Sequence, residues 1–89
     1  MSASYKIINI CNLWKVNNQR NNKFIKAFGD NLRKIRIRKG MSQETLAMSA
    51  DMERSQVARI ERGEINTTIS TVLAIANALE VEVTDLFRF

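Results

Sequence analysis

The feature that most constrains this chain is the segment from Ser42 to Gly63, SQETLAMSADMERSQVARIERG, whose pattern predicts two short helices joined by a tight turn. Ser42 is a favourable N-cap, because its hydroxyl can accept a hydrogen bond from an unpaired amide of the first turn. Asp51 tolerates left-handed backbone angles and is the residue expected in the turn. The second helix is expected from Arg54 to Arg62, and Gly63 is placed to close it.

The second of these helices is expected to have two dissimilar faces. At about 100° per residue, one side of the helix carries Val57, Ile60 and Glu61. The opposite side is polar and basic, and it carries Ser55, Ala58, Arg59 and Arg62, with Arg54 at the N-terminal tip. A basic face with a small residue at its centre can approach a polyanion closely.

Two short helices, a tight turn and a polar N-terminal half on the second helix describe the helix-turn-helix reader of the DNA major groove. Through SQETLA and RIERG the segment resembles the Cro and phage-repressor type of helix-turn-helix, often called the Xre family. FGDNLRKIRIRKGMSQ before it and TTISTVLAIANALEVEVTDLF after it are similar to the other helices of that domain. The resemblance covers residues 28–87. It implies an all-α, compact five-helix domain that binds double-stranded DNA as a transcriptional regulator.

Two positions depart from the pattern of that family. The turn position, commonly Gly, is Asp51, and the cap before the second helix, commonly Ser or Thr, is Glu53. Asp can adopt the left-handed backbone conformation of the turn at a modest cost in conformational free energy. Glu53 gives a weaker cap and places a negative charge near the DNA.

Composition sets the bounds around this motif. A chain of 89 residues allows one small domain with a modest core. The absence of proline and the presence of only three glycines favour helices, and a formal charge of +5 indicates an anionic partner. The helix-turn-helix domain is expected at residues 24–89, with the motif itself at residues 43–62.

The single cysteine and the absence of histidine exclude several classes of function. Cys11 cannot form an internal disulfide, which favours a reducing, cytoplasmic setting at the nucleoid of a bacterium or in a phage system. A zinc site and a histidine acid or base are excluded, so no metal, no cofactor and no catalysis are expected. No apolar run is long enough to span a membrane, so no membrane partner is expected.

Residues 1–23 are predicted to form a basic, asparagine-rich extension. It has six Asn, four Lys or Arg, and no acidic residue. The spacing of Ile7, Ile10 and Trp14 suits a short amphipathic helix, but YKIINIC equally suits a strand. Three interpretations stay open: a flexible or loosely docked arm, a docked or dimer-exchanged element, and a minor-groove arm like that of homeodomains.

The segments on both sides of the motif have helical spacing. A helix over residues 24–39 is expected to end at Gly40, with a core-facing stripe of Phe24, Phe28, Leu32 and Ile35. Thr68 is expected to cap a helix whose inward face carries Ile69, Val72, Ile75, Ala76 and Leu79. Thr84 is expected to cap a final short helix.

Glu61 falls in the last turn of the second motif helix, where a negative charge meets the negative end of the helix dipole. An acid in that place should have a cation partner. The resemblance supplies one, since family members pair an Arg of the first helix with the Glu of the RIERG-like motif, at positions that match Arg36 and Glu61. We therefore expect these two residues to form a structural ion pair.

The DNA contacts are expected to come from the second motif helix and its surroundings. The predicted base-reading residues are Arg54, Ser55, Gln56 and Arg59. The two arginines are the best candidates for guanine, because a guanidinium can donate two bonds to O6 and N7. Phosphate contacts are expected from Gln43, Arg38, Lys39, Arg62, Thr67 and Thr68.

The C-terminal part is more apolar than a free surface needs. A homodimer contact is therefore predicted at Leu73, Leu86, Phe87 and Phe89. The resemblance implies that such a dimer binds a two-fold DNA site.

The specific role stays open between two classes of function. A phage-type repressor, a general bacterial regulator and a controller protein of a restriction-modification operon all match the sequence, the last through ERSQVARIERG. The other class is an antitoxin or a protein-interaction co-regulator whose DNA binding is secondary.

Overall fold

The computed structural model describes residues 21–89, which form four α-helices and a short 3-10 helix. In chain order these are α2 (Asn22–Arg38), α3 (Gln43–Ser49), α4 (Arg54–Glu61), α5 (Ile69–Leu79) and η2 (Val83–Phe87). No strand occurs in this part of the chain, so the predicted all-α fold is confirmed. The interpretations that concern residues 1–20 lie outside the described residues.

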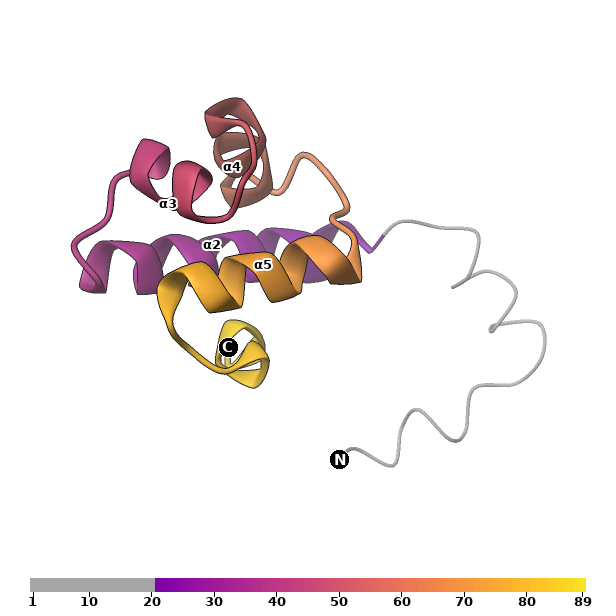
Figure 1. The fold of residues 1–89 in the computed structure, drawn as a ribbon. Coiled ribbons are helices and arrows are strands. Elements are labelled where there is room, and N and C mark those ends of the chain that lie inside the picture. The colour runs from indigo at the N-terminus through magenta and orange to yellow at the C-terminus, as the bar shows by residue number, and fades with distance from the viewer. Residues whose placement is uncertain (1–20) are drawn as a thin grey trace, which may run out of the picture.

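The motif helices and the C-terminal helix lie on opposite sides of α2 and α5. In Figure 1, α3 and α4 lie above α2 and α5, and η2 lies below them with the C-terminus. α2 packs against α4 and η2, and α5 packs against α3 and η2. The helix pair predicted to bind DNA is thus supported from one side by the rest of the described domain.

Side-chain caps define where most of the helices begin. Ser42 accepts a hydrogen bond from Thr45 N at 3.0 Å, and Thr68 accepts one from Thr71 N at 3.2 Å, so both predicted caps are confirmed. Glu53 makes no side-chain cap bond, as its departure from Ser or Thr implies. The predicted Thr84 cap is wrong, because η2 begins at Val83 after Glu82, which forms a capping box with Asp85.

Left-handed backbone conformations end the helices at the expected places. Asp51 adopts a φ of 56° in the turn between α3 and α4. Gly40 and Gly63 adopt φ values of 72° and 73° where α2 and α4 end. A fourth such residue, Glu80 at the end of α5, has a φ of 59° and was not expected, because Glu has no special tolerance for this region.

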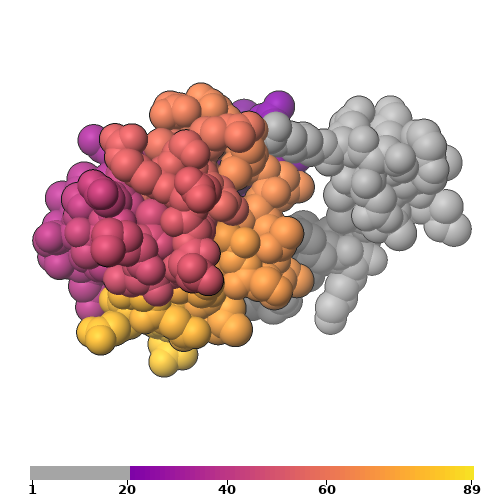
Figure 2. All heavy atoms as spheres, turned by 45° about the horizontal axis from the view of Figure 1, so that its top comes forward, coloured from indigo at the N-terminus to yellow at the C-terminus, as the bar shows by residue number. Residues whose placement is uncertain are grey.

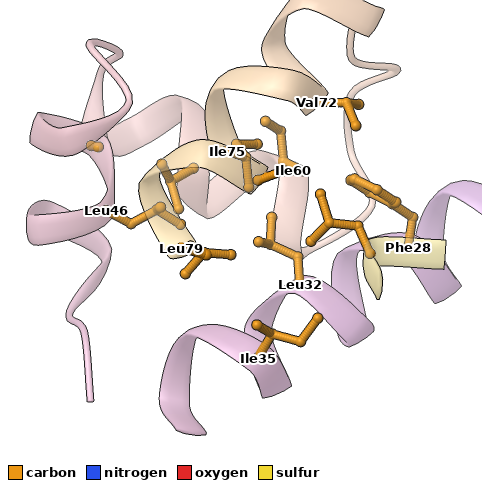
Figure 3. Packing of buried hydrophobic residues seen from close by; sticks show 12 residues of the cluster. Phe28, Leu32, Ile35, Leu46, Ile60, Val72, Ile75 and Leu79 are labelled. Atoms are coloured by element: carbon orange, nitrogen blue, oxygen red, sulfur yellow. The ribbon is translucent and has the colours of Figure 1, made fainter. Parts of the chain in front are cut away.

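The core draws on all five elements. Figure 3 shows Leu32 of α2, Leu46 of α3, Ile60 of α4 and both Ile75 and Leu79 of α5 converging between the helices. The largest fully buried side chains are Leu32, Leu46, Ile60, Ile75, Leu79, Leu86 and Val57. Most of the predicted inward positions of α2, α4 and α5 are therefore confirmed.

Two predicted core residues are exposed instead. Phe24 is 47% exposed and Ile69 is 89% exposed, so both assignments to the core are wrong. Each lies in the first turn of its helix, where the apolar stripe continues beyond the packing partners that residues 21–89 provide. Phe24 instead stacks on Phe87 with ring centroids 6.0 Å apart, and Phe89 lies 5.4 Å away.

A glycine lets α2 and α4 approach closely. A Cβ atom at Gly29 would lie 2.3 Å from Ile60 O and 2.7 Å from Glu61 O, both backbone atoms. On the other side of α2, Asn31 Nδ2 donates to Asp85 O and Leu86 O at 3.0 and 2.9 Å, which attaches η2. None of the helices formed by residues 21–89 has both the length and the apolar character needed to cross a bilayer.

Candidate nucleic-acid interface

A buried ion pair holds the motif helix α4 on α2. Arg36 Nε donates to Glu61 Oε2 at 2.6 Å and Arg36 Nη2 donates to Glu61 Oε1 at 3.0 Å. The side chains of Arg36 and Glu61 are 10% and 2% exposed. This two-pronged geometry is the strong form of an arginine–carboxylate interaction, and it confirms the structural pair that the resemblance implied.

Two further hydrogen bonds extend this pair to the start of α3. Arg36 Nη1 donates to Met41 O at 2.8 Å, in the segment between α2 and α3. Gln43 Nε2 donates to Glu61 Oε1 at 3.0 Å, so Gln43 also braces α4. The ion pair thus connects α2, α3 and α4, and its hydrogen bonds fix the orientation of α4 relative to α3.

The outer face of α4 carries the predicted base-reading side chains. Arg54, Ser55 and Arg59 are exposed and Gln56 is partly exposed, whereas the opposite face of the helix is buried through Val57, Ile60 and Glu61. Figure 2, with α3 and α4 turned toward the viewer, shows these helices forming one continuous face of the molecule. Because its inner face is anchored, α4 presents its outer polar face to solvent in one fixed orientation.

Glu64 is an acid beside this face, and the sequence alone predicted no role for it. Its carboxylate accepts hydrogen bonds from Arg62 Nε at 2.7 Å and Arg62 Nη2 at 3.2 Å, and Arg59 Nε lies 3.9 Å away. The Arg62 hydrogen bonds lower the pKa of Glu64 below its ordinary value, and Glu64 in turn raises the pKa of Arg62. Both groups are exposed, so solvent screens the pair.

Three of the predicted phosphate contacts lack geometric support. The Thr67 hydroxyl oxygen is buried, so the side chain does not face a phosphate, and only a contact through the Thr67 backbone amide stays a prediction. Arg38 and Lys39 line a hollow with Val81 and Arg88 on the η2 side of α2, away from α4. Of the remaining three, Gln43 and Arg62 lie at the ends of the motif, and the exposed Thr68 caps α5.

The predicted dimer contact divides into buried and exposed residues. Leu86 is 0% exposed and belongs to the core of this chain, so its assignment to a dimer contact is wrong. Leu86 is the buried residue of η2, and the apolar character of the C-terminal part did not distinguish it from its exposed neighbours. Leu73 and Phe89 are 51% and 56% exposed, and Phe87 is 40% exposed.

Comparison with known proteins agrees with this geometry. The Helix-turn-helix family matches residues 32–86. Control protein C.BamHI of Bacillus amyloliquefaciens is 41% identical over 63 residues, which are 70% of this chain and 78% of that protein. The immunity repressor of Bacillus phage phi105 is 38% identical over 55 residues, which are 62% of this chain and 38% of the repressor.

A solved structure gives the same result in three dimensions. The restriction-modification controller protein C.AhdI from Aeromonas hydrophila superposes with a TM-score of 0.70 and 43% identity. The superposition covers 71% of this chain and 96% of that one. The fold and the motif therefore define a DNA-binding transcriptional regulator. The chain belongs to the Helix-turn-helix family, of the Cro and phage-repressor type.

Proposed function

We propose that α4 enters the major groove of double-stranded DNA and that Arg54, Ser55, Gln56 and Arg59 contact base edges there. The observation that carries the proposal is the contrast between the two faces of α4, one anchored through the Arg36–Glu61 pair and the other polar and exposed. Arg54 and Arg59 each donate two bonds to a guanine. Removing either contact costs about 1 to 3 kcal/mol of binding free energy at one base position.

Phosphate contacts position α4 without reading sequence. Gln43 opens α3 and Arg62 follows α4, so they lie at the two ends of the motif. Arg62 must leave or share Glu64 to bind a phosphate, and this exchange costs little because the pair is exposed. Thr68 contributes through the first amides of α5.

The proposed active form is a homodimer that binds a two-fold DNA site. Leu73 is a large apolar side chain of α5 that is about half exposed, and Phe87 and Phe89 are exposed near the C-terminus. A symmetric contact between two copies covers apolar surface of this kind. Half-sites are then expected about 10 to 10.5 bp apart, or at a multiple of that spacing.

Among regulators, we favour a restriction-modification controller, acting without catalysis. Both C.BamHI and C.AhdI are named as controllers, and this chain covers 78% and 96% of their lengths, compared with 38% of the phage repressor. The match therefore extends over most of each controller and over a smaller part of the repressor.

Selection of bound sites from random DNA tests the proposal. The protein should enrich a two-fold sequence with the half-site spacing given above, and the complex should contain two protein chains. A promoter that carries the enriched site should change its transcription when the protein is added. Enrichment of no sequence, together with retention only at low salt, would contradict specific reading.

A further inference from the structure

An apolar pocket remains open at the N-terminal end of α2. It has a volume of about 190 Å³ and lies between α2, the segment that leads into α5, and η2. Its walls include Phe24, Phe28, Ile69 and Phe87. Three of these four, Phe24, Ile69 and Phe87, are among the large apolar side chains that the described region leaves exposed.

One polar group inside this apolar pocket has no partner. Thr67 lines the pocket, and its hydroxyl oxygen is buried without a hydrogen-bond partner among residues 21–89. Buried hydroxyl groups in native proteins are nearly always hydrogen-bonded. The pocket therefore suits an occupant with a flat or bulky apolar body and a single hydrogen-bonding group.

The sequence of the chain itself contains such a group. Residues 5–14, YKIINICNLW, are the most apolar part of the N-terminal extension and end in Trp14, the only tryptophan. An indole combines a large apolar ring system with one N–H donor, which usually finds an acceptor when it is buried. Its chemistry therefore matches that of the pocket.

The connection is long enough and enters at the right place. The Asn21 side chain accepts a hydrogen bond from Phe24 N at 3.0 Å, so the chain joins α2 directly at the rim of the pocket. Six residues lie between Trp14 and Asn21, so a fully extended connection spans roughly 23 to 25 Å from one Cα atom to the other. A segment tethered so closely is present at high effective concentration, which favours it over any separate molecule.

We propose that residues 5–14 of the same chain cover this pocket and that the Trp14 ring occupies it, its indole N–H donating to Thr67 Oγ1. The extension then completes the hydrophobic core at the N-terminal ends of α2 and α5. This inference does not depend on DNA binding.

Tryptophan fluorescence of the full chain tests this directly, because Trp14 is the only source of tryptophan emission. The folded protein should emit at shorter wavelength than the urea-unfolded protein, and acrylamide should quench it several-fold less. Emission and quenching equal to those of the unfolded chain would overturn the proposal.

Two substitutions on α5 separate the pocket from the proposed dimer surface. Ile69→Lys places a charge at the pocket rim, and Ile69 is exposed enough for the fold to survive, which circular dichroism checks. Leu73→Lys, one turn along the same helix, makes the same change outside the pocket. Only Ile69→Lys should shift the emission to longer wavelength. Equal shifts in both variants would mean that a second copy covers the pocket, and would overturn the proposal.

Two further measurements test whether the pocket and Trp14 belong to the same chain, and whether Thr67 accepts the indole hydrogen bond. The wavelength of the emission should not depend on protein concentration. A shift to longer wavelength on dilution would mean that the indole of one chain occupies the pocket of another chain, and would overturn the assignment to the same chain. Exchange of the indole N–H proton with solvent should be slow in the parent and at least several-fold faster in Thr67→Val. Equal exchange rates would exclude Thr67 as the acceptor.

Discussion

Replacing Glu61 with alanine is the perturbation whose result follows most directly from the structure. The substitution removes the acceptor of three hydrogen bonds, two from Arg36 and one from Gln43. The Arg36 guanidinium keeps only its bond to Met41 O among the bonds described here, and Arg36 is only 8% exposed, so water cannot fully replace the carboxylate. Breaking a buried pair by removing one partner costs about 3 to 5 kcal/mol.

Thermal unfolding followed by circular dichroism measures this loss. For a domain of this size a loss of about 3 kcal/mol lowers Tm by roughly 12 to 24 °C. The double variant Arg36→Met/Glu61→Leu removes both charges together and should be much more stable than Glu61→Ala, because no unpaired buried charge remains. A double-mutant cycle that adds the single variants Arg36→Met and Glu61→Leu then gives the coupling free energy between the two residues.

Two outcomes would refute the structural role of the pair. Glu61→Ala that melts within a few degrees of the parent would show that the pair contributes little. A double variant no more stable than Glu61→Ala would show that the loss comes from packing around position 61 and not from the unpaired guanidinium. The exposed pair Lys26–Asp30 provides a control, since Asp30→Ala should change stability by less than about 1 kcal/mol.

Three further predictions concern the backbone and the Arg62–Glu64 pair. Glu80→Gly should raise stability by about 1 kcal/mol in urea unfolding, because glycine relieves the left-handed conformation at φ 59°, whereas Glu80→Ala should give no such gain. Gly29→Ala should lower stability by about 1 to 3 kcal/mol, since its Cβ would force α2 and α4 apart, and a more stable variant would contradict the close approach. The pKa of Glu64, followed by NMR titration, should lie below its ordinary value and rise toward it in Arg62→Gln. Because the pKa of Glu64 is lower in the folded state, the contribution of Glu64 to stability is present above the ordinary pKa. It is lost as the pH falls through the lowered pKa. A Glu64 pKa that Arg62→Gln leaves unchanged would exclude Arg62 as the cause.

The parts of the fold that local chemistry determines were predictable from sequence. Ser42 and Thr68 cap their helices through side-chain bonds to amides three residues ahead, which is a local signal. Asp51 and Gly63 occupy left-handed turns for similarly local reasons. The Arg36–Glu61 pair spans 25 residues and came from the family resemblance.

Contacts set by tertiary packing could not be predicted in the same way. Periodicity indicates which face of a helix is apolar, but it cannot indicate where the covering elements end, so Phe24 and Ile69 were wrongly placed in the core. Leu86 was misassigned because an excess of apolar residues in the C-terminal part does not indicate which of them the core takes. Gly29 gave no signal, since a glycine within a helix reveals its purpose only when the backbone of α4 lies against it.

The most direct measurement is selection of bound DNA by the parent and by two arginine variants in parallel. Arg59→Ala removes a side chain from the proposed reading face, and Arg33→Ala removes an exposed arginine of α2 that this face does not include. We expect Arg59→Ala to lose discrimination at one position of each half-site, by a factor of roughly 5 to 150 that corresponds to about 1 to 3 kcal/mol, while Arg33→Ala keeps the parent sequence. An Arg59→Ala protein that enriches the same sequence with the same stringency as the parent would show that α4 does not read the bases.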